Sequence, residues 1–178
     1  YVADYGNNAI KKIAAADGAV TVLLSGIIRP RNVAVDGLGN VYVADPENSA
    51  VKKIAASDGS VTSVGSGFNM PYGITTDVSG NIFVADWNYH KIKKIDTNGT
   101  ITELGSGFVH PFNVDIDALG NVYVADNGDN TIKKIAASDG SVSTLGSGFT
   151  TPLGVAVDGS GNVYVADQSS STIKKIVM

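Results

Sequence analysis

Gly39-Asn40-Val41-Tyr42-Val43-Ala44-Asp45 is the stretch that decides the fold, because close copies of it recur through the whole chain of 178 residues. Its closing aspartate returns at nearly constant intervals, at Asp4, Asp45, Asp86, Asp126 and Asp167. A fixed period of about 41 residues is typical of architectures that repeat one supersecondary unit. We therefore interpret the chain as a single domain of five copies, at residues 1–29, 30–70, 71–110, 111–151 and 152–178.

Each copy contains four short segments rich in β-branched and aromatic residues, which predict antiparallel strands joined by tight turns. In the second copy these segments are Asn32–Asp36, Asn40–Asp45, Ala50–Ile54 and Val61–Val64. The second segment is apolar on both of its faces, so each sheet needs an apolar neighbour on either side. Stacking around an axis provides such neighbours. The predicted fold class is all-β, a β-propeller of four-stranded antiparallel blades.

The two ends of the chain do not together supply the strands of one complete blade. The chain starts in a second strand at Tyr1 and stops after a third strand at Ile176, which gives about four and a half blades. We therefore expect a segment of a larger ring, with a processed or cut N-terminus. The unpaired edges at both ends predict self-association.

Bulk composition excludes several classes of protein. The 43% hydrophobic and 17% charged residues are typical of an ordinary globular chain, and no apolar run is long enough to cross a membrane. Zero cysteines exclude disulfides and thiolate metal sites. The net charge of −4 provides no general attraction to nucleic acid or anionic membranes. Ten of the 13 basic residues form one Lys-Lys pair per copy, so they belong to a repeated strand rather than to a binding patch.

A propeller presents two loop surfaces, which we name here. The turn face holds the connections from first to second strands and from third to fourth strands. In the former, Asp-x-x-Gly-Asn recurs four times and predicts hairpin turns rather than calcium sites. The loop face holds the connections from second to third strands and from one blade to the next, where the copies differ. Candidate binding residues on the loop face are Arg29, Arg31, Glu47, Met70, Tyr72, Trp87, Tyr89, His90, Lys91, His110 and Phe112. Varied loops on a rigid scaffold are typical of a binding surface, and drift of unconstrained loops is the alternative.

Two kinds of aspartate need separate interpretations. The aspartate that ends each second strand recurs in every copy, so we expect it to cap the following loop rather than to catalyse a reaction. Asp115 instead stands where other copies have Ala34, Thr75 and Ala156, in a strand expected to line the central channel. There it could contact a ligand or an ion, or be hydrated by channel water.

The strings Gly-Asn-Val-Tyr-Val-Ala-Asp and Ile-Lys-Lys-Ile, preceded by a Pro-x-Gly/Asn-Val/Ile segment, resemble the NHL repeat family of β-propellers. The resemblance covers the whole chain and implies the fold more specifically than the activity. Related propellers include sensor domains, RNA-binding domains, protein-interaction domains and a few lyases.

Three functions remain open on this basis. We expect non-enzymatic binding of a protein or small-molecule ligand, with no catalytic residue, metal or cofactor, in a bacterial protein that is secreted or extracytoplasmic. The resemblance to streptogramin lyase-like propellers implies the alternative of a metal-dependent lyase or hydrolase, for which His90, His110 and Glu47 have the right chemistry. RNA binding through Arg29, Arg31, Lys91, Trp87 and Tyr89 is the third, and acidic residues on the same face argue against nucleic acid.

Overall fold

The structure, a computed structural model, describes residues 1–178 and contains 18 strands in five antiparallel sheets. Each complete sheet has its four strands in chain order. These are β4 (Asn32–Val35), β5 (Val41–Asp45), β6 (Ala50–Ile54) and β7 (Val61–Ser63); β8 (Pro71–Thr76), β9 (Ile82–Asp86), β10 (Lys91–Ile95) and β11 (Ile101–Leu104); and β12 (Pro111–Ile116), β13 (Val122–Asp126), β14 (Thr131–Ile135) and β15 (Val142–Gly146).

A three-stranded sheet stands at each end of the chain. The first contains β1 (Val2–Asp4), β2 (Ala9–Ile13) and β3 (Val20–Ser25), and the last contains β16 (Pro152–Val157), β17 (Val163–Asp167) and β18 (Thr172–Ile176). Short 3-10 helices, η1 (Tyr5–Asn7), η2 (Pro46–Asn48) and η3 (Asn127–Asp129), follow three of the second strands. The predicted strands of the second copy agree with the observed ones to within one residue at each end.

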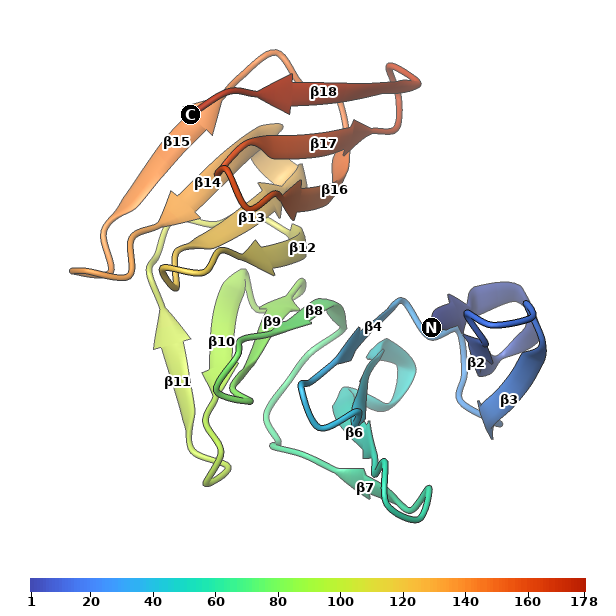
Figure 1. The fold of residues 1–178 in the computed structure, drawn as a ribbon. Coiled ribbons are helices and arrows are strands. Elements are labelled where there is room, and N and C mark those ends of the chain that lie inside the picture. Colours follow the sequence, from blue (N-terminus) through green and yellow to red (C-terminus); the bar gives the residue numbers. More distant parts are fainter.

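The five sheets fan around a centre at which β4, β8, β12 and β16 lie, with β7, β11 and β15 on the outside (Figure 1). The first and last sheets stand apart, so the arc is open. This arrangement confirms an all-β propeller of about four and a half blades. No helix in the structure is long and apolar enough to cross a membrane.

The second strand of each blade packs on both of its faces, as the sequence predicts. Val41 and Val43 lie in a core cluster with Ile10 of the first sheet, whereas Tyr42 and Ala44 lie in a cluster with the third sheet. Four such clusters fill the four junctions between the five sheets. Full burial of one valine or isoleucine side chain contributes about 1.5–3 kcal/mol, so these junctions hold the blades together.

Hydrogen bonds to a carboxylate organise the turn face. Asp36 accepts the backbone N–H groups of Leu38 and Asn40, each at 2.9 Å, and the hydroxyl of Tyr42 at 3.0 Å. Asp117 repeats this arrangement with Tyr123. Because protein donors occupy both oxygens, these aspartates serve as the fixed points of their hairpin turns.

Two of these tyrosines provide a prediction for alkaline pH. Burial, together with the bond to the neighbouring aspartate, raises the pKa of Tyr42 and of Tyr123 to about 12. A phenol whose pKa is raised by folding stabilises the fold fully below about pH 10, and that contribution is lost as the pH rises toward 12. We expect two phenolates to form only near pH 12 in a titration followed by ultraviolet absorbance.

The double variant Tyr42→Phe/Tyr123→Phe is the matched comparison, because the third copy naturally has Phe83 at this position. The double variant should show no absorbance step near pH 12, and its free energy of unfolding should fall less steeply above about pH 10. Each substitution should cost about 1 kcal/mol at neutral pH. An unchanged absorbance step near pH 12 in the double variant would contradict the assignment.

The outward faces of the two end sheets carry exposed apolar side chains. Ile13, Val20 and Val22 are exposed on the first sheet, and Ile173 is exposed on the last. In the third blade the positions that correspond to Ile13 and Ile173 are Ile95 and Ile92, and both are buried against a neighbouring sheet. Self-association through these ends remains a prediction.

Candidate functional site

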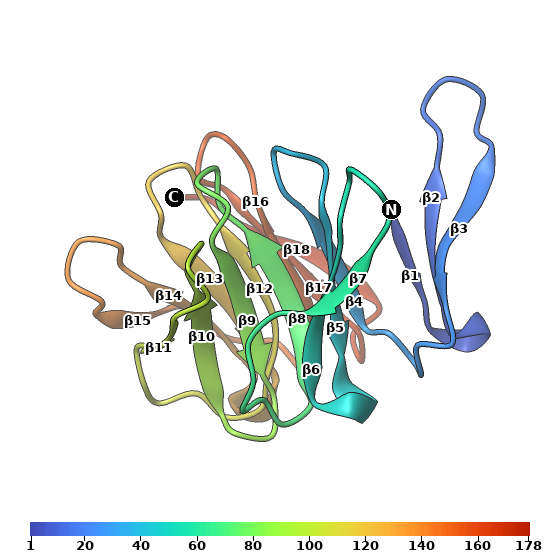
Figure 2. The same ribbon diagram turned by 90° about the horizontal axis from the view of Figure 1, so that it is seen from below.

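The two kinds of loop that form the loop face are joined by backbone hydrogen bonds. The N–H of Trp87 donates to the carbonyl of Met70 at 3.2 Å, and the N–H of Asn88 donates to that of Asn69 at 3.1 Å. In Figure 2 the helical turns after β1 and β5 lie on the lower side of the molecule, and the β2–β3 connection lies on the upper side. Residues from different blades therefore meet on one surface.

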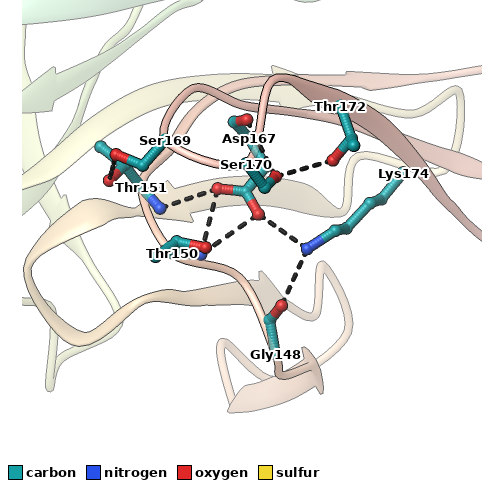
Figure 3. Close-up of polar contacts among 8 residues, drawn as sticks. All are labelled: Gly148, Thr150, Thr151, Asp167, Ser169, Ser170, Thr172 and Lys174. Atoms are coloured by element: carbon teal, nitrogen blue, oxygen red, sulfur yellow. Dashed lines mark hydrogen bonds and ion pairs between the residues drawn. The ribbon is translucent and has the colours of Figure 1, made fainter.

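An ion pair between the repeated aspartate and the first lysine of the Lys-Lys pair lies beneath the loop face in each blade, and Figure 3 shows the one in the last copy. Asp167 accepts the backbone N–H groups of Thr150 and Thr151 and the ammonium of Lys174, the last at 2.7 Å. Lys174 also donates to the carbonyl of Gly148 at 2.8 Å. The pair thus ties two strands of one blade to the loop that arrives from the preceding blade.

The third and fourth copies repeat this arrangement in a more buried form. Lys93 donates to Asp86 and to the carbonyl of Gly67, and Lys133 donates to Asp126 and to the carbonyl of Gly107. Burial raises the pKa of Asp86 and Asp126, although their lysines oppose the shift. In the more open last copy the hydrogen bond from Lys174 holds the pKa of Asp167 well below its usual value.

The expectation that the repeated aspartates cap the following loop is wrong for the third to fifth copies. Their backbone donors belong to the preceding inter-blade loop, at Asn69, Val109 and Thr150. Only Asp4 accepts the backbone N–H of the following turn, at Asn7. The lysine partners were missed, although the sequence contains a signal for them: in every copy the first lysine of the pair follows the aspartate at the same interval.

Aromatic rings from two neighbouring blades form one connected cluster on the loop face. Tyr72 stacks on Trp87 with ring centroids 5.4 Å apart, and Phe112 meets Tyr72 edge-on at 5.1 Å. His110 lies 4.3 Å from Trp87, and His90 lies 4.3 Å from His110. The backbone N–H of His110 donates to Nδ1 of His90 at 3.0 Å, which fixes that ring against the neighbouring blade. We call these five residues the aromatic cluster.

Arg31 extends the aromatic cluster toward the first blade. Its guanidinium carbon lies 4.7 Å from the ring centre of Tyr72 and 4.7 Å from that of Tyr5. Tyr5 was not among the predicted binding residues, although it occupies the same position after the repeated aspartate as Trp87. Arg29 also lies beside the ring of Tyr5, and it forms an ion pair with Glu47 at 3.9 Å.

The remaining predicted residues lie outside the cluster. Lys91 pairs with Glu103 at 2.8 Å, and Tyr89 is half exposed with its ring 4.7 Å from the ammonium of Lys93. Met70 contributes its backbone carbonyl to the loop contact and has a left-handed backbone, with φ of 57°. These three residues therefore flank the cluster.

The chemistry needed for a metal-dependent reaction is not assembled on this face. No group of three or more histidine, cysteine, aspartate and glutamate side chains is placed to hold a metal ion. His90 and His110 are in contact, but Glu47 is engaged with Arg29. The structure therefore does not join these three residues into a metal site.

Asp115 connects three neighbouring blades at the centre of the arc. Its carboxylate accepts the backbone N–H of Val157 in β16 at 2.8 Å and the hydroxyl of Thr75 in β8 at 3.4 Å. It also accepts the N–H of Ile116 at 2.9 Å. Since protein donors use both oxygens, the expected contact with a channel ligand or with water is not needed to explain this carboxylate.

The main cavities of the structure lie away from the aromatic cluster. One of about 520 Å³ lies between the second and third blades and is lined by turn-face residues such as Asn40 and Asn98. Others of about 320 and 390 Å³ occupy similar places between neighbouring blades. None of the five main cavities includes Trp87, His90 or His110 in its lining. The rings of Trp87, His90, His110 and Phe112 are partly exposed, whereas Tyr72 is buried, with 8% of its surface exposed.

Comparisons with solved structures agree on the fold. The nidogen/laminin complex contains a chain that is 20% identical, with a TM-score of 0.85 over 94% of this chain and 66% of that one. Virginiamycin B lyase from Staphylococcus aureus, solved with quinupristin, is 21% identical with a TM-score of 0.79, over 98% of this chain and 60% of that one. A putative gluconolactonase is 17% identical, with a TM-score of 0.75 over 91% and 65%.

This chain thus spans between 60% and 66% of the length of these three structures. No curated protein matches it at a significant level. The sequence profile described as NHL repeat matches residues 149–176, which include β16, β17 and β18. Close copies of the strings within that match recur in the earlier copies, which form four-stranded sheets in the second to fourth copies and a three-stranded sheet in the first. The fold of the chain is therefore that of a β-propeller, and its last copy matches the NHL repeat.

Proposed function

We propose that this chain is a protein-recognition module that binds its partner through the aromatic cluster and Arg31 on the loop face. The observation that carries the proposal is the continuous contact between Tyr72, Trp87, Phe112, His110 and His90, which come from two blades. Aromatic and arginine side chains are the usual energetic anchors of protein interfaces. Here the scaffold fixes them before a partner arrives.

A partly exposed group of aromatic rings outside the main cavities favours a protein partner over a small molecule. Small ligands are usually bound in concave sites that bury most of their surface. The main cavities instead lie between blades and away from the cluster. The propeller in the nidogen/laminin complex, which has the same fold, is solved together with a protein partner.

Selection of a displayed random peptide library against this chain provides a test. The key variant is Trp87→Gln/Phe112→Leu, which installs the residues found at Gln168 and Leu153 in the last copy. We expect selected peptides to bind it about 30-fold more weakly, because losing an interface anchor costs at least about 2 kcal/mol. The matched control is Leu38→Ser/Leu119→Ser on the turn face, where both leucines are more than four-fifths exposed.

Control and wild type should bind the peptides equally. Calorimetry measures the affinities without depending on Trp87, and thermal midpoints of all variants establish that they fold. Peptides that bind the first variant normally and lose affinity for the turn-face control would place recognition on the wrong surface and contradict the proposal.

A further inference from the structure

The charges of the loop face are almost completely paired within the chain. Every carboxylate there, and in the ion pairs beneath it, lies within 4 Å of a lysine or arginine, namely Asp4, Asp45, Glu47, Asp86, Glu103, Asp126, Asp129 and Asp167. The basic residues of the same surface are equal in number, so the surface is neutral overall. The net charge of −4 belongs to the rest of the chain.

Arg31 is the exception among these basic residues, because it forms no ion pair within the chain. Arg29, two positions earlier, pairs with Glu47, and Lys91 on the neighbouring blade pairs with Glu103. The only hydrogen bond from Arg31 is its backbone N–H to the carbonyl of Ala44, at 3.4 Å. Its guanidinium N–H donors are therefore available to an outside group.

The position of Arg31 favours recognition of a carboxylate. Tyr5 and Tyr72 each lie 4.7 Å from its guanidinium carbon, so contacts between the cation and the two rings hold it in place. Stacking uses the flat faces of a guanidinium and leaves its edges free, and those edges match the two oxygens of a carboxylate. Less side-chain entropy is lost on binding when the arginine is already held.

The neighbours of Arg31 define what accompanies the carboxylate. Tyr72 contacts both Arg31 and Trp87, and Trp87 in turn contacts His110. A group bound at Arg31 therefore lies beside an aromatic surface. In an extended peptide a side chain two positions from the carboxylate points to the same side and lies about 6.6 Å further along, so it would reach this surface.

We propose that Arg31 binds a glutamate or aspartate side chain of an acidic protein segment, with an aromatic or apolar residue two positions from that carboxylate packed on the partly exposed ring of Trp87. This inference rests on the proposed function and specifies the chemistry of the partner. A single unpaired cation on a neutral surface suits one carboxylate. Nucleic acid is disfavoured because its binding requires several lysines and arginines to neutralise successive phosphates.

Three matched peptides test the proposal, namely acetyl-Tyr-Ser-Glu-Ser-Tyr-amide and its counterparts with Gln or Lys in place of Glu. Fluorescence of Trp87, the only tryptophan, reports binding beside Arg31. We expect the Glu peptide to bind about tenfold more tightly than the Gln peptide, and the Lys peptide to bind most weakly. The variant Arg31→Gln should bind the Glu and Gln peptides equally, because its charge is gone.

Arg29→Gln is the control, since Arg29 already has Glu47 as a partner. It should keep the tenfold preference. Equal affinity of the wild-type chain for the Glu and Gln peptides, or no binding of any peptide up to about 10 mM, would overturn the proposal. So would tighter, salt-sensitive binding of a twelve-nucleotide oligouridylate that Arg31→Gln weakens.

The two proposals fail in different ways. If Trp87→Gln/Phe112→Leu abolishes binding of library-selected peptides while Arg31→Gln leaves their affinity unchanged, the recognition surface stands and the carboxylate site is overturned. If neither variant changes their affinity, both proposals are overturned.

Discussion

Replacing Lys93 by methionine is expected to destabilise the protein by about 3–5 kcal/mol, the usual cost of removing one partner from a buried ion pair. Lys93 is 7% exposed and donates to Asp86, which is fully buried, at 2.7 Å and to the carbonyl of Gly67 at 2.6 Å. Methionine fills a similar volume but leaves the carboxylate and the carbonyl without this donor. The loss would loosen the contact between the second and third blades, because Gly67 lies in the loop that connects them.

Lys94→Met is the matched control for this substitution. The ammonium of Lys94 lies 5.7 Å from the ring centre of Phe83 and forms no ion pair, so its loss should cost at most about 1 kcal/mol. Unfolding in denaturant measures both variants. The double variant Asp86→Asn/Lys93→Met should recover part of the loss, because no unpaired charge remains buried. Equal costs for Lys93→Met and Lys94→Met would contradict the assigned role of the buried pair.

Gly73→Ala is expected to destabilise the protein by about 1–3 kcal/mol or more, because two inner strands approach each other at this residue. A Cβ atom on Gly73 would lie 2.5 Å from the Cα of Asn113 and 2.8 Å from the carbonyl oxygen of Phe112. Both atoms belong to the backbone of β12, which would have to move. The amide of Asn32 also donates to the side-chain oxygen of Asn113 at 3.1 Å, linking β4 to β12 across the blade that contains Gly73.

Gly37→Ala provides the control for this crowding. No atom lies within 4 Å of a Cβ built on Gly37, so its substitution should change stability by less than about 0.5 kcal/mol. Gly154→Ala should fall between the two, since its Cβ would meet only the methyl group of Ala166 at 3.2 Å. Thermal or denaturant unfolding measures this series. A neutral effect of Gly73→Ala would contradict the close packing of the inner strands.

The fold could be predicted because its information is local and repeated. The alternation of Val41, Tyr42, Val43 and Ala44 identifies a strand that is apolar on both faces, and the structure places the two faces in different core clusters. Turns such as Asp36–Asn40 mark the strand ends within a residue. The same pattern predicts the sheet in all five copies.

The details of the loop face could be predicted only in part. The sequence indicates which variable residues share that face, because the repeat assigns every loop to one side. It does not indicate that Arg31 lies between Tyr5 and Tyr72, because these three side chains come from three different copies and meet only through the packing of blades. Nor does it separate Arg29, which has an acidic partner, from Arg31, which has none.

The central claim is that the loop face is the recognition surface, and amide hydrogen exchange with and without a selected peptide tests it most directly. The account predicts that bound peptide slows exchange in residues 68–70, 87–90 and 108–112, which surround the aromatic cluster, and leaves the turn-face residues 36–40, 77–81 and 117–121 unchanged. Slower exchange confined to the turn-face residues would contradict the account.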